Sequence, residues 1–165
     1  MHDSDEGPLP AYIAGLARIR AAAGALFRDE SGKVLVVHPT YKDHWDIPGG
    51  MLERDESPYA ACTREITEEL GITPDIGPLL CVDWVSPHPP WDCGLMFVFD
   101  GGVLGAREVA DIRLDQVEID RIDFVPPDEL DGLLAPGLAA RIRACARNTG
   151  TASLYLEDGF PLSRR

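Results

Sequence analysis

Three glutamates, Glu65, Glu68 and Glu69, are spaced so that one turn of helix would gather their carboxylates. At about 100° per residue, Glu68 and Glu69 fall roughly 60° and 40° to either side of Glu65, so the three acids crowd one arc. Like charges this close repel each other, and the last two also lie at the unfavourable end of the helix dipole. A cation such as Mg²⁺, which prefers oxygen ligands, would remove this conflict. The alternative is a solvated acidic face with no ligand.

The flanking residues predict a helix from about Pro58 to Leu70. Ser57 is a favourable N-cap, proline suits the first turn, and Gly71 is a natural stop. Four apolar residues fall on one side of this helix and would dock it on a sheet: Tyr59, Cys62, Ile66 and Leu70.

The elements that must position this helix are predicted from apolar segments elsewhere in the chain. Segments 19–27 and 33–38, separated by a polar, glycine-containing break, predict a β-hairpin. Further strands are expected at 79–85, 95–99 and 121–126, with a second helix at 128–147 broken at 136–137. Strands interleaved with two main helices favour an α/β or α+β domain around a mixed sheet.

The length of 165 residues and the 45% hydrophobic content favour one domain. We expect a flexible tail at residues 1–16, a single domain at 17–150 and a C-terminal tail at 151–165. The first ten residues lack the basic and apolar regions of a secretion signal, and no apolar run reaches the roughly 18 residues of a membrane span. These features predict a cytoplasmic protein without a membrane partner.

The formal charge of −13 argues against a partner of long nucleic acid, because phosphate contacts from basic residues supply most of that affinity. A small phosphorylated nucleotide remains possible if bound cations neutralise the site. The four cysteines form no CxxC pair and lie in apolar or helical surroundings, which predicts neither disulfides nor zinc.

The wider spacing around the glutamates decides between a metal site and a solvated face. Gly50 is followed after five residues by Glu56, and after seven more by Arg64-Glu65-Ile-Thr-Glu-Glu-Leu-Gly-Ile72. This pattern resembles the Nudix hydrolase signature at every defined position, and Trp45-Asp-Ile-Pro-Gly-Gly50 resembles the family's usual lead-in. The resemblance implies a Nudix-type αβα sandwich around a mixed sheet.

The resemblance also implies roles for these residues. The metal ligands, for Mg²⁺ or Mn²⁺, would be Glu65, Glu68, Glu69 and the backbone carbonyl of Gly49. The structural brace of the signature would be Gly50, Glu56 and Arg64, with direct phosphate contact as the alternative for Arg64. The implied reaction is attack of water on a phosphorus of a nucleoside diphosphate linked to another group.

The general base is expected outside the signature. Glu118 resembles the acidic residue that family members place before a strand ending in a proline-containing turn, and an ordinary solvated acid is the alternative. Asp123, on the predicted strand itself, is the second candidate.

The substrate is predicted from loops around the signature. Pro87 lies 15 residues after Ile72, which resembles the subgroup acting on ADP-ribose, although His88 stands where that subgroup usually has glycine. A rigid turn would explain the same proline. Aromatic faces bind nucleobases, so the predicted substrate-binding residues are Tyr41, Trp45, Pro87 and Trp91.

The first candidate is therefore ADP-ribose or another nucleotide sugar. The alternatives are a nucleoside triphosphate pyrophosphohydrolase and a noncatalytic nucleotide-binding domain of the same fold. A homodimer is a further possibility, because dimers are frequent in the resembling family.

Overall fold

A mixed sheet of eight strands forms the centre of the protein, seen in a computed structural model that describes residues 10–148 and 150–162. The strand order is β6-β2-β1-β5-β4-β7-β8, with β3 paired to β1. The strands are β1 (Arg20–Arg28), β2 (Val34–Pro39), β3 (Gly49–Met51), β4 (Leu79–Val85), β5 (Gly94–Val103), β6 (Ile119–Val125), β7 (Leu154–Glu157) and β8 (Phe160–Pro161). Strand β1 is parallel to β5 and β4 is parallel to β7, whereas the other pairs are antiparallel.

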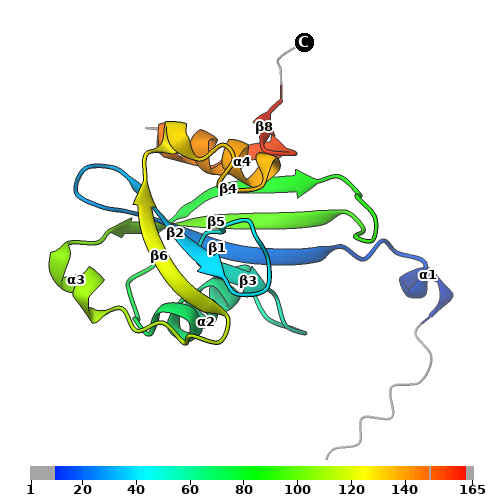
Figure 1. The fold of residues 1–165 in the computed structure, drawn as a ribbon. Coiled ribbons are helices and arrows are strands. Elements are labelled where there is room, and N and C mark those ends of the chain that lie inside the picture. The colour runs from blue at the N-terminus through cyan, green and yellow to red at the C-terminus, as the bar shows by residue number, and fades with distance from the viewer. Residues whose placement is uncertain (1–9, 149, 163–165) are drawn as a thin grey trace, which may run out of the picture.

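Helices cover both faces of this sheet (Figure 1). The helical elements are α1 (Ala11–Ala14), α2 (Pro58–Leu70), α3 (Ala106–Asp111), the 3₁₀ turn η1 (Pro127–Glu129) and α4 (Pro136–Arg147). Because side chains alternate along a strand, Leu35 packs toward α2 while its neighbour Val36 packs toward α4. Two separate cores result, and the predicted αβα sandwich around a mixed sheet is confirmed.

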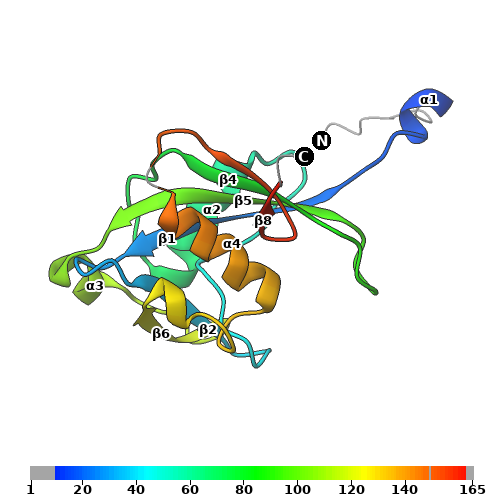
Figure 2. The same cartoon turned by 90° about the horizontal axis from the view of Figure 1, so that it is seen from above.

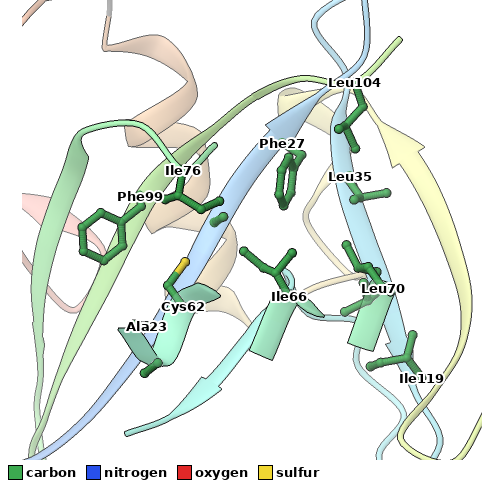
Figure 3. Packing of buried hydrophobic residues seen from close by; sticks show 13 residues of the cluster. Ala23, Phe27, Leu35, Cys62, Ile66, Leu70, Ile76, Phe99, Leu104 and Ile119 are labelled. Atoms are coloured by element: carbon green, nitrogen blue, oxygen red, sulfur yellow. The ribbon is translucent and has the colours of Figure 1, made fainter. Parts of the chain in front are cut away.

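Helix α2 follows the sequence prediction at both ends. The Ser57 side chain accepts a hydrogen bond from the backbone N–H of Ala60, and the helix ends at Gly71 with φ of 65°. Its residues Cys62, Ile66 and Leu70 lie fully buried and point toward the sheet in Figure 3. The apolar stripe therefore fixes which way the acidic side of α2 faces.

The predicted helix at 128–147 is correct only in its second half. Residues before Pro136 form η1 and isolated bridges, because Pro136 keeps the preceding Ala135 out of the helical conformation and can only begin a new helix. Helix α3 and the short strand β3 were not predicted.

The expectation of a C-terminal tail at 151–165 is wrong for residues 154–161. Strand β7 pairs with β4 in parallel, and Leu156 is fully buried against the α4 core. Only four residues long, β7 gives too short an alternating pattern to identify from sequence. The domain division at 17 and 150 otherwise stays a prediction, and residues 1–9 of the expected N-terminal tail lie outside the described residues.

Helix α1 lies at the end of an extended segment that leads into β1 (Figure 2). No helix in the described part of the chain is long and apolar enough to cross a membrane. The cytoplasmic location stays a prediction.

Candidate active site

Two glycines bring the backbone of β3 against β1 and α2. Gly49 has φ of 147°, and a Cβ there would lie 2.4 Å from the backbone oxygen of Ala23. A Cβ on Gly50 would lie 2.4 Å from the carboxyl carbon of Glu65. Only glycine permits this approach, so the pair lets a carboxylate of α2 contact the loop backbone directly.

Glu69 is the buried member of the three glutamates, with 6% of its surface exposed. Its Oε2 accepts a hydrogen bond of 2.9 Å from the backbone N–H of Gly49. Burial raises the pKa of Glu69 to about 8; the Gly49 bond opposes this shift, and the negative charges of Glu65, Asp46 and Glu118 add to it. The carboxylate therefore sits in an environment with an excess of negative charge.

Glu65 and Glu68 turn toward Arg64 instead. Arg64 Nη1 donates to Glu65 at 2.8 Å and to Glu68 at 3.1 Å. The guanidinium also makes a two-point contact with Glu56, at 2.8 Å and 2.9 Å, and donates to the backbone carbonyl of Met51. Glu56 and Arg64, two of the three residues predicted to brace the signature, thus contact each other, and Arg64 joins the loop to α2.

The three glutamates do not converge on one point. Within residues 10–148 and 150–162, no three acidic, histidine or cysteine side chains lie close enough to hold a metal ion. The donor chemistry nevertheless fits a divalent cation, because the charges of Glu65, Asp46 and Glu118 act on the buried Glu69 carboxylate, whose hydrogen-bond donor among the described residues is the backbone amide of Gly49. The residues that would hold such an ion are Glu65, Glu68, Glu69 and the carbonyl of Gly49.

Of the two candidates for the general base, Glu118 carries a charge that acts on this cluster, whereas Asp123 lies exposed on β6. The charge of Glu118 contributes to the raised pKa values of both Glu69 and Tyr41. Its loop is fixed by the Asp115 carboxylate, which accepts three backbone N–H groups. Asp123 is exposed on β6 and accepts from the backbone N–H of Phe124.

A cavity of about 700 Å³ opens beside the two glycines. Tyr41 and Trp91 line it, as predicted for substrate-binding residues, and the Arg20 guanidinium lies 5.1 Å from the centre of the Trp91 ring. Trp45 and Pro87 do not line it. Trp45 instead packs edge-on against His38 at 5.1 Å and belongs to the α4 core.

Sequence reasoning missed several charged residues that line the cavity. Lys42 and Asp46 form an ion pair at 2.6 Å, and the buried Arg141 reaches the cavity from α4. The signal in the sequence for these two residues is their position: Asp46 lies within the Trp45–Gly50 lead-in, and Lys42 shortly precedes it. Arg141 gives no local signal, because an arginine in a helix usually points to solvent.

Comparison with known proteins adds the family context. Residues 18–147 match the NUDIX domain family. A MutT-like protein from Streptomyces ambofaciens is 37% identical over 122 residues, which cover 74% of this chain and 73% of that protein. The human diphosphoinositol polyphosphate phosphohydrolase 3-alpha is 42% identical over 65 residues, which cover 38% of this chain and 40% of that protein.

Solved structures share the architecture. The MutT protein from Methanosarcina mazei Go1 superposes with a TM-score of 0.62 and 27% sequence identity, covering 79% of this chain and 93% of that one. The matched residues 18–147 contain the two glycines, α2 and α4.

Proposed function

Because residues 18–147 show that the chain belongs to the Nudix hydrolase family, we propose that it cleaves a diphosphate linkage within a nucleotide derivative. The proposed substrate is a nucleoside diphosphate joined to another group, and the proposed cofactor is Mg²⁺ or Mn²⁺. One observation carries the proposal: the buried Glu69 carboxylate is held by Gly49 among other acids, beside a cavity large enough for a nucleotide.

The side chains of this protein have the following roles in the proposed reaction. The carboxylates of Glu65, Glu68 and Glu69 would hold the cation. When bound, that cation supplies positive charge that polarises the phosphoryl oxygens. Arg64 keeps Glu65 beside Gly50, and the Glu118 carboxylate accepts the proton of the attacking water.

The proposed choice of substrate comes from a loop outside the signature. ADP-ribose or another nucleotide sugar is the first candidate, from the position of Pro87 in the sequence. Nucleoside triphosphates are the alternative. A cavity of about 700 Å³ accommodates either.

The test compares the unmodified protein with Glu69→Gln and Glu65→Gln on nucleotide sugars, dinucleotides, coenzyme A and nucleoside triphosphates, with Mg²⁺ or Mn²⁺. Each variant should lose about 100-fold or more in kcat, because a charged oxygen that stabilises the transition state is removed. Glu53→Gln, at an exposed position of the loop between β3 and α2, is the matched control and should keep full activity. Near-normal turnover by Glu69→Gln, with products identified by mass, would refute the assignment.

A further inference from the structure

Arg141 is a buried arginine whose hydrogen-bonding capacity is mostly unused. Its side chain is 10% exposed, and its Nε donates to Oδ2 of Asp83 at 2.6 Å. Among the described residues, neither of its Nη nitrogens has a hydrogen-bond partner, and neither is fully buried, while Arg141 lines the cavity. Their N–H groups are therefore donors that Arg141 can offer to a ligand in the cavity.

The surroundings hold this guanidinium in one place. Asp83 is fully buried on β4, and its second oxygen accepts from the backbone N–H of Gly159 at 3.0 Å. Gly159 has φ of 88°, and a Cβ there would lie 2.6 Å from the carbonyl of Gly137 on α4. The turn between β7 and β8 thus packs against α4, and each oxygen of Asp83 accepts a hydrogen bond. Arg141, and not Asp83, lines the cavity.

The same turn shapes the neighbouring wall. Asp158 accepts hydrogen bonds from the backbone and hydroxyl of Ser86, at 2.8 Å and 2.8–2.9 Å. Ser86 begins the loop that carries His88 and Trp91 to the cavity. The turn after β7 thus supports Arg141 through Asp83 and the loop of Trp91 through Ser86, and both residues line the cavity.

The chemistry of this end limits what it can bind. The charge of Arg141 is already balanced by Asp83, and much of the nearby lining is apolar: Val85, Met96, Val98 and Leu138. A second phosphate dianion placed against this pair would lose its hydration and meet a group that carries no net charge. A flat, neutral group with oxygen acceptors at its edge matches an apolar slot that ends in N–H donors.

We propose that Arg141 determines specificity by donating to the carbonyl edge of a keto nucleobase, guanine or uracil, on the substrate. Adenine and cytosine present an amino group where these bases present O6 or O4, and the amine would face the N–H donors of Arg141. A site built to donate rejects the analogue that lacks the acceptor. This inference rests on the proposed function, and among the nucleotide sugars proposed there it favours those that carry a keto base.

The experiment uses the full chain with GDP-glucose, UDP-glucose, ADP-glucose and CDP-glucose, which differ only in the base. The unmodified protein should show kcat/KM about 10-fold or more higher for the two keto substrates, because an amino group at that edge leaves the N–H donors of Arg141 unpaired. Arg141→Lys keeps the charge pair with Asp83 but loses the planar fork, so this ratio should fall toward one. Arg143→Lys, on the same helix and paired with Asp131 away from the cavity, should keep the full ratio.

Binding separates failure of this inference from failure of the proposed activity. If none of the four sugars is cleaved, the proposed nucleotide-sugar activity fails, and calorimetry with GDP, UDP, ADP and CDP still measures base preference. Tighter binding of GDP and UDP that Arg141→Lys abolishes supports the inference. Equal handling of keto and amino bases by the unmodified protein overturns it, as does a ratio that a folded Arg141→Lys variant retains.

Discussion

Arg64 is ion-paired with three glutamates of the signature. It contacts Glu56 through two nitrogens and reaches Glu65 and Glu68 through the third. Those hydrogen bonds raise the pKa of Arg64, with the Glu56 bond as the largest cause, and they lower the pKa of Glu56 to about 2. The brace is therefore charged at every pH at which the protein is expected to work.

Replacing Glu56 by glutamine should destabilise the fold in a pH-dependent way. The folded pKa of about 2 lies below the ordinary value of 4.5, so the unfolded chain binds the proton first as the pH falls. The stabilisation is fully present above about pH 4.5 and is lost as the pH falls toward 2. Urea unfolding from pH 7 to pH 2.5 should show the gap between the unmodified protein and Glu56→Gln closing. A gap that stays constant would show that the ion pair does not supply the difference.

At the scale of single elements, local sequence sets both ends of α2, and the helix positions the glutamates of the site. Ser57 and Pro58 set where the helix begins, and Gly71 ends it in the left-handed conformation. The backbone N–H of Arg113 then donates to the carbonyl of Leu70, which ties the segment after α3 to the end of the helix. A change at this end should loosen the turn that carries Glu68 and Glu69.

Gly71→Ala should lower the free energy of unfolding by more than the roughly 1–2 kcal/mol of a left-handed alanine. The added methyl would also lie 2.9 Å from the carbonyl oxygen of Arg113. Gly32→Ala is the matched control, because Gly32 has φ of 85° and no atom within 4 Å of the new Cβ. Urea denaturation should rank Gly71→Ala as the more damaging change, and the opposite order would refute the packing argument.

At the scale of the whole molecule, the C-terminal segment completes the sheet and the cavity together. Strand β7 extends the sheet beside β4, and the turn after it supports Asp83 and Ser86. Residues far beyond the signature thus support the part of the cavity that Arg141 and Trp91 line.

Leu156→Ala should therefore cost about 2–5 kcal/mol, the range for truncating a fully buried leucine. Leu156 has no exposed surface, whereas its neighbour Tyr155 is 51% exposed on the other side of β7. Tyr155→Ala serves as the control and should cost less than about 1 kcal/mol. Equal losses of unfolding free energy for the two variants would mean that β7 is not part of the cooperative fold.

The sequence by itself determined α2 and the contacts of the signature. Caps, apolar period and the spacing of Glu56, Arg64 and Glu65 act through neighbours along the chain, so they can be read from a short segment. The main strands were also predictable, because their apolar runs contrast with the polar turns around them.

Only the tertiary structure decided how Asp83, Arg141 and Gly159 meet, and which aromatic residues face the cavity. Asp83 is separated from Arg141 by 58 residues and from Gly159 by 76, and strand pairing rather than local spacing sets such contacts. Tertiary packing also buries Glu69, which raises its pKa, and leaves Glu68 exposed. No local pattern records that difference, because it depends on which side of α2 the sheet covers.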